Sequence, residues 1–113
     1  MWRLILVALL LGGCSKGSEE DLQYIKQARS ASAEWALTNE EANRGQLTTT
    51  YVASMHKWIR QEIQSSATGL SQPQSPYGAE IQALLRLPDD ASPEQLRAHS
   101  DELKHIEDSL ESA

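Results

Sequence analysis

Glutamate and histidine are the residue types in this sequence best suited to metal binding, and one pair has a spacing known from metal sites. Glu102 and His105 lie three positions apart, which is the Glu-x-x-His spacing of carboxylate-bridged di-iron helical bundles. Such a site needs two of these motifs and two further glutamates on inward helix faces. The inward face predicted here carries His99 and Leu103 instead, so the sequence predicts no metal site and no cofactor.

The other two histidines suggest weaker hypotheses. His99 falls on the apolar stripe of the last predicted helix. It is either a pH sensor, since imidazole titrates near neutrality, or a partly buried group bonded to a neighbour. Met55 and His56 are residue types that bind copper, but adjacent side chains on a helix point about 100° apart and do not converge on one ion.

Two pairs of carboxylates could in principle serve as general acid and base. They are Glu40-Glu41 and Asp89-Asp90, and both lie among polar neighbours. Adjacent residues on one helix do not face each other, so solvated side chains are the expected outcome. The sequence therefore predicts no catalytic residue, and we expect the protein not to be an enzyme.

Cys14 is the only cysteine of the chain and follows the features of an export signal. Arg3 supplies a positive start, residues 4–11 form an unbroken apolar run, and two glycines precede the cysteine. The apolar run is far below the roughly 20 residues that span a bilayer as a helix, so a permanent transmembrane anchor is not expected. Residues 1–13 are predicted to be a signal peptide.

The segment Leu11-Gly12-Gly13-Cys14 resembles the lipobox of bacterial lipoproteins. The resemblance implies that the sulfur of Cys14 takes a diacylglyceryl group, that the chain is cut before it, and that the new amine is acylated, with palmitate as the expected chain. Ser15, in place of an aspartate, implies sorting to the outer membrane of the cell envelope, facing the periplasm. The resemblance covers fifteen residues, and the rest of the chain resembles no family of known function. The alternatives are an ordinary secretory signal or a cytosolic apolar N-terminus.

Length and charge limit the classes of partner. The chain has 113 residues, 10 basic and 16 acidic, with a formal net charge of −6, which fits one small acidic domain. Such a domain repels phosphate backbones, so nucleic acid is not an expected partner. The expected partners are the membrane, through acyl chains on Cys14, and an envelope protein.

Apolar residues recur with helical spacing through most of the chain, and no strand alternation appears, which predicts an all-α fold. The first helix is expected over 19–44, capped by Ser18 and ended by Gly45, which can take a positive φ. Its inward face is predicted to consist of Ile25, Ala28, Ser32, Trp35, Asn39 and Ala42.

Three further helices are predicted after Gly45. Thr48 is expected to cap a helix over 49–67, a short helix precedes Pro88, and a last helix begins at Ser92-Pro93 and runs to about residue 111. The expected fold over 19–113 is a small up-down helical bundle with two long helices, one short and one medium. Residues 14–18 would form its lipidated tether.

The longest irregular segment is predicted at residues 65–78, where serine, glutamine, proline and glycine are frequent. A loop of this length in a small domain is either disordered or has a function of its own. Tyr77 lies in it and is the residue expected at a partner interface, because aromatic residues are enriched in such interfaces.

Aromatic residues on the first two predicted helices allow two interpretations. Trp35, Tyr51, Met55 and Trp58 fall on apolar faces, where they either pack the core or line a groove for a small apolar ligand or lipid. Three functions remain open on this basis. The first is a non-enzymatic, lipid-anchored interaction or assembly module; the others are an apolar-ligand binding module and an envelope inhibitor or immunity-type lipoprotein.

Overall fold

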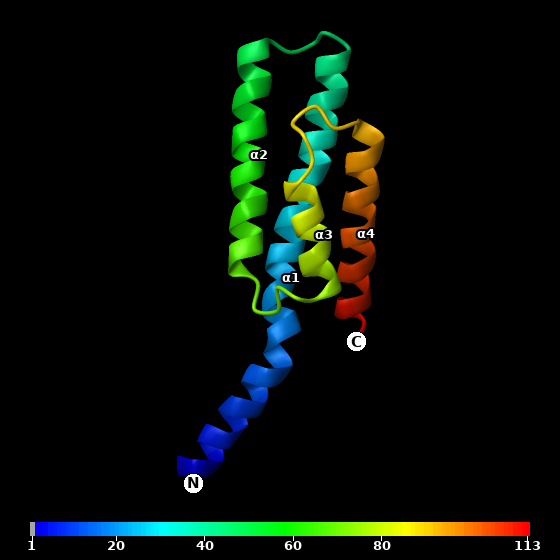
Figure 1. Ribbon diagram of the computed structural model, residues 1–113. Coiled ribbons are helices and arrows are strands. Elements are labelled where there is room, and N and C mark those ends of the chain that lie inside the picture. Colours follow the sequence, from blue (N-terminus) through cyan, green and yellow to red (C-terminus); the bar gives the residue numbers. More distant parts are fainter. Residues whose placement is uncertain (1) are drawn as a thin grey trace.

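The computed structural model is an all-α bundle, as the periodicity predicted (Figure 1). It describes the backbone of residues 2–113 and the side chains of residues 17–113. Four helices follow in order: α1 (Trp2–Asn43), α2 (Thr49–Gly69), α3 (Pro76–Leu85) and α4 (Pro93–Glu111). Among the described residues, no helix combines the length and the apolar character needed to cross a membrane.

The predicted signal peptide (1–13) and the predicted lipidation site at Cys14 lie outside the side chains that the structure describes. Both therefore stay predictions. Side chains of a candidate site can therefore be placed from Gly17 onward.

The helices alternate in direction, which gives the expected up-down arrangement (Figure 1). α1 is the central helix and packs along both α4 and α2. The short α3 contacts the other three helices and lies between α2 and α4 in Figure 1. The C-terminal ends of α2 and α4 and the N-terminal end of α3 lie at one end of the bundle (Figure 1). Gly17 of α1 lies beside them, since its backbone oxygen accepts a hydrogen bond from Ser71 at 2.9 Å. We call this end the tether end.

Several helix termini carry the predicted caps. The Thr48 hydroxyl accepts a hydrogen bond from the N–H of Tyr51 at 3.1 Å, and Ser92 accepts one from Gln95 at 3.1 Å. Gly45 follows α1 with a φ of 72°, a conformation that L-residues with a Cβ adopt at a cost. These contacts satisfy backbone groups that a helix end leaves unpaired.

Two predicted boundaries were wrong. Ser18 lies within α1, so it is not an N-cap. The irregular segment is only residues 70–75, not 65–78, because α2 continues to Gly69 and α3 begins at Pro76. The hydroxyls of Ser66 and Thr68 bond to carbonyls four residues earlier, at 3.0 and 2.9 Å. These bonds satisfy the two hydroxyls within the helix, so neither draws the backbone into a turn.

The core is built around the predicted inward face of α1. Five of its six predicted members are buried, and Ala42 is half-buried. On α2, Ile59 and Ile63 are inside, whereas Tyr51 and Trp58, which were predicted on an apolar face, are about half exposed. The buried apolar side chains of the other helices and linkers include Leu70, Tyr77, Ile81, Leu84, Ala91, Leu96 and Leu103.

Candidate functional site

The four residues predicted to line a groove between the first two helices do not share one surface. Trp35 is only 1 % exposed and belongs to the core, while Met55 is half-buried at the core edge. Tyr51 and Trp58 are 50 % and 48 % exposed. The interpretation as core packing is therefore correct for Trp35, and these four side chains line no common groove.

Tyr51 and Trp58 instead form an exposed aromatic pair on α2. They lie seven residues apart, which is two turns, so they share one face of the helix. Large apolar side chains left half exposed on a small domain are informative, because tryptophan and tyrosine are enriched where proteins bind each other. We refer to these two residues as the aromatic pair.

Tyr77 is not at the surface, so its prediction as an exposed partner contact was wrong. It lies in the first turn of α3 and is 4 % exposed. Its hydroxyl donates to Oδ2 of Asp21 at 2.6 Å. The same carboxylate accepts the backbone N–H groups of Ser71, at 2.7 Å, and Gln72, at 3.1 Å.

Asp21 therefore fastens the α2–α3 linker to α1. It is 1 % exposed, and a buried carboxylate is costly unless its oxygens are hydrogen-bonded. Burial raises the pKa of Asp21, but the bonds from Ser71, Tyr77 and Gln72 outweigh burial and hold that pKa below its ordinary value. Burial, and then the neighbouring carboxylate, raise the pKa of Tyr77.

A second polar cluster fastens the α3–α4 linker to α1. The backbone oxygen of Asp89 accepts the indole N–H of Trp35 at 2.9 Å and the amide of Asn39 at 2.9 Å. Asn39 also donates to the backbone oxygen of Ala91 at 2.8 Å. Its Oδ1 lies 2.7 Å from Nε2 of His56, so this imidazole nitrogen must carry the hydrogen.

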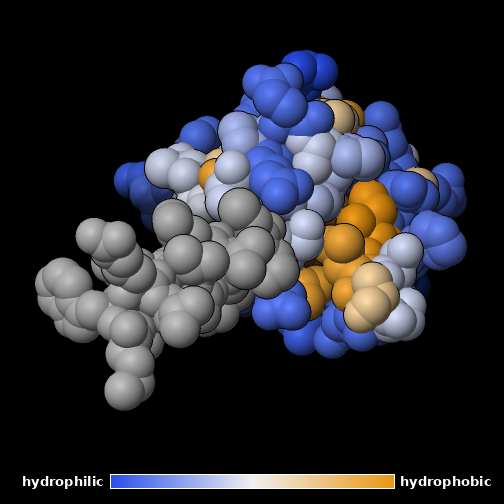
Figure 2. Space-filling view, turned by 90° about the horizontal axis from the view of Figure 1, so that it is seen from below, coloured by the Kyte–Doolittle hydropathy of each residue, from blue (hydrophilic) through white to orange (hydrophobic). Residues whose placement is uncertain are grey.

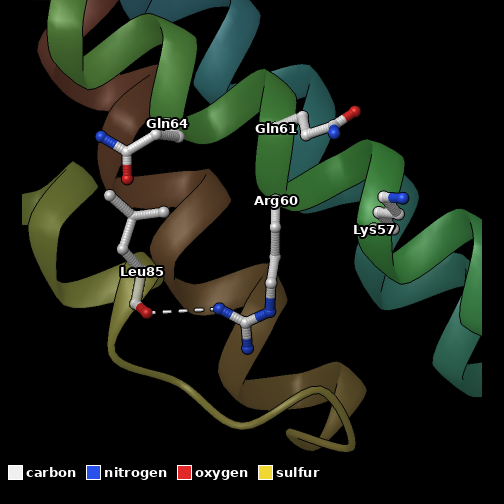
Figure 3. A pocket seen from close by; sticks show the side chains of 5 residues that line it. All are labelled: Lys57, Arg60, Gln61, Gln64 and Leu85. Atoms are coloured by element: carbon white, nitrogen blue, oxygen red, sulfur yellow. Dashed lines mark hydrogen bonds between the residues drawn. The ribbon is translucent and has the colours of Figure 1, made fainter.

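Arg60 of α2 completes this second cluster, and Figure 3 shows its side chain reaching the backbone oxygen of Leu85. Its three guanidinium nitrogens donate to the Asp89 carboxylate and to the backbone oxygens of Leu85 and Leu87. The guanidinium carbon lies 4.9 Å from the centre of the Trp35 ring, a cation–π distance. The hollow of about 380 Å³ beside it is lined by Lys57, Arg60, Gln61, Gln64 and Leu85. All three guanidinium nitrogens of Arg60 already donate to other groups of the chain. We therefore interpret this hollow as the outer side of the cluster that holds the α3–α4 linker.

Of the other two histidines, His99 contacts a neighbouring carboxylate and His105 is exposed. His99 is half-buried, and its Nδ1 contacts a carboxylate oxygen of Glu80 on α3, which agrees with the interpretation as a group bonded to a neighbour. His105 and Glu102, the Glu-x-x-His pair, are both exposed. They do not converge on the one acidic cluster found among the described residues.

That cluster consists of Glu107, Asp108 and Glu111, and each of its members faces a cation of the chain. Glu107 pairs with Arg29 at 2.7 Å. Asp108 pairs with Lys104 at 2.8 Å, and Glu111 pairs with Lys26 at 3.3 Å. Its charge is therefore compensated within the bundle.

Two short patterns known from serine enzymes also occur. Residues 13–17 read Gly-x-Ser-x-Gly, and Ser54 and Lys57 have Ser-x-x-Lys spacing. The first pattern works on a strand-to-helix turn, whereas α1 is continuous through these residues. Ser54 and Lys57 are both exposed on α2, whereas activating a lysine requires desolvation or a charged neighbour. Neither pattern has the context that its chemistry needs.

An apolar cleft opens near the tether end, where hydrophobic side chains gather on an otherwise largely hydrophilic face (Figure 2). Its volume is about 360 Å³, and its exposed lining is mainly apolar. Ile106 and Leu110 of α4 form one wall, opposite Pro76 and Tyr77 of α3. The polar part of the lining consists of Ser18, Gln72, Ser75, His105 and Ser109.

Sequence reasoning did not identify Asp21, Arg60 or this cleft, and it placed Asn39 on the inward face without assigning it a role. Asp21 reads as an ordinary acidic residue of a first helical turn, and Asn39 reads as a polar interruption of a core face. Comparisons with protein-family models, with curated proteins and with solved structures find no match for this chain.

Proposed function

We propose that this protein is a lipid-anchored component of the bacterial cell envelope whose helical bundle is a non-enzymatic interaction or assembly module. The anchor part of the proposal rests on the lipobox-like segment that ends in Cys14. Three acyl chains, the number that this resemblance implies, would hold the protein far more durably than one, since each buried methylene contributes about 0.8 kcal/mol.

The observation that carries the interaction part is the aromatic pair. Tyr51 and Trp58 are each about half exposed on one face of α2, although the neighbouring Ile59 and Ile63 are fully buried. Aromatic side chains of this kind supply much of the binding free energy where they become buried by a partner. This face of α2 is the surface that we assign to an envelope protein partner.

The non-enzymatic part is supported by the roles of the polar groups inside the bundle. Asp21 holds one linker, Asn39 and Arg60 hold the other, and Glu107 pairs with Arg29. These are positions at which a buried charge or amide stabilises the fold. Their hydrogen-bonding capacity is used by the chain itself.

Metabolic labelling with a palmitate analogue tests the anchor. We expect label on the wild-type protein and on Ser15→Ala, the matched control at the next residue. Cys14→Ala should lose the label and accumulate as uncut precursor. A processed, unlabelled Cys14→Ala protein that stays in the membrane fraction would contradict the anchor.

Site-specific photo-crosslinking in cells tests the partner surface. A photoreactive residue in place of Trp58 should give a discrete crosslinked product. The same residue in place of Ala53, which is exposed and lies about 140° around the axis of α2 from Trp58, should not. Equal crosslinking from both positions, or from neither, would count against the aromatic pair as the contact surface.

A further inference from the structure

The apolar cleft near the tether end lies close in the chain to the predicted lipidation site. Ser18 belongs to its lining and follows Cys14 by four residues. Four residues span at most about 14 Å when fully extended. The first described side chains, Gly17 and Ser18, are already in α1, so little slack separates the bundle from an anchor at Cys14.

From this relationship we propose that the cleft rests on the lipid bilayer and that Pro76, Ile106 and Leu110, which back onto the buried Tyr77, contact the acyl chains of membrane phospholipids. The inference rests on the proposed anchor at Cys14. It adds an orientation: the tether end faces the membrane, and the α1–α2 turn around Gly45 points away from it.

The chemistry of the cleft fits a lipid surface. Its exposed apolar groups are aliphatic, while hydroxyl, amide and imidazole groups complete the lining. A mainly apolar lining that also carries polar groups matches the boundary between acyl chains and headgroups, where amphipathic protein surfaces bind.

The anchor makes a weak contact of this kind effective. A tether converts a second binding event into an intramolecular one with a high effective concentration. A surface that would bind a free lipid only weakly can therefore stay in contact with the bilayer. Glu19 and Glu20 are exposed next to Ser18, so the contact should favour net-neutral phospholipids over anionic ones.

Fluorescence quenching on the full lipidated protein tests the proposal. Ser109 lines the cleft and is exposed, so Ser109→Cys can carry a polarity-sensitive dye, since the lipidated sulfur of Cys14 does not react. Ser54→Cys, exposed on α2, is the matched control. Both proteins are reconstituted into phosphatidylcholine vesicles that contain a nitroxide-labelled phospholipid.

We expect the nitroxide lipid to quench the dye at position 109 and not the dye at position 54, and aqueous iodide to show the reverse order. Leu110→Asp in the Ser109→Cys background should lose the nitroxide quenching while the protein still floats with vesicles. Thermal melting of this variant shows whether it remains folded. The comparison of the two dye positions does not depend on it.

Other occupants of the cleft give different results, and each would overturn the proposal. A blue-shifted dye at position 109 without nitroxide quenching would indicate the chain's own acyl group. A signal that depends on the protein-to-lipid ratio would indicate a second copy of the chain. Equal quenching by iodide at both positions would show that the cleft faces water. Failure of the wild type to float would instead count against the anchor itself.

Discussion

The hydroxyl of Tyr77 donates to the carboxylate of Asp21 at 2.6 Å, across 56 positions of sequence. This bond lies inside the bundle and joins the first turn of α3 to α1. Together with the bonds that Asp21 accepts from Ser71 and Gln72, it fixes the α2–α3 linker and one wall of the apolar cleft.

Replacement of Asp21 by Asn should destabilise the protein by about 1–3 kcal/mol, because the amide NH₂ cannot accept the bonds that one carboxylate oxygen now receives. Tyr77→Phe should cost about 1 kcal/mol, since it leaves the backbone donors in place. Urea denaturation measures both. Tyr51→Phe is the control at an exposed position and should change stability by no more than about 0.5 kcal/mol. Equal losses for the two Tyr→Phe variants would contradict the buried bond.

The contribution of Asp21 should depend on pH. Its pKa is lowered from the ordinary 3.8 by hydrogen bonds to the ionised form, so folding favours the carboxylate. The stabilisation is fully present above the unfolded-state pKa and is lost as pH falls through the lowered folded-state value. Free energies of unfolding for wild type and Asp21→Asn, measured from neutral to acid pH, should therefore converge at low pH. A difference that grows on acidification would reverse the assigned sign.

Asn39 should be a stability determinant despite its polar side chain. It is 4 % exposed and bonds to two backbone oxygens of the α3–α4 linker and to His56. Asn39→Ala should cost about 1–3 kcal/mol, because buried acceptors and the imidazole lose their partner. Asn43→Ala, near the exposed end of the same helix, should change stability by about 0.5 kcal/mol or less. Similar denaturation midpoints for the two variants would argue against a stabilising role for the hydrogen bonds of Asn39.

Gly45 should resist substitution because of its backbone conformation. Its φ is 72° and nothing lies within 4 Å of where a Cβ would stand, so the cost is conformational and not steric crowding. Gly45→Ala should lower stability by about 1 kcal/mol or more. Gly45→Asn should lose less, since asparagine tolerates this region. Thermal denaturation of the two variants measures these losses. A larger loss for Gly45→Asn than for Gly45→Ala would show that the positive φ is not the source of the cost.

Much of the fold could be predicted from local sequence. Helical spacing gave the buried face of α1, and Thr48, Gly45 and Ser92-Pro93 gave helix ends, because capping depends on residues within one turn of each other. The end of α2 was missed because Ser66 and Thr68 are turn formers by type. In the folded protein Ser66 is buried against the other helices, and both hydroxyls bond to carbonyls of their own helix.

The sequence by itself therefore determined the number, order and approximate length of the helices. It also contains a lipobox-like N-terminus, which suggests a cellular location. Tertiary structure decided which face of α2 turns inward, that Tyr77 lies inside the bundle, and that Asp21 and Asn39 hold the two linkers of α3. It also decided where the apolar cleft lies, since α3 and α4 form it together. The physical reason is range: helix periodicity and caps act over a few residues, whereas these contacts join segments that are distant along the chain and meet only after the helices pack.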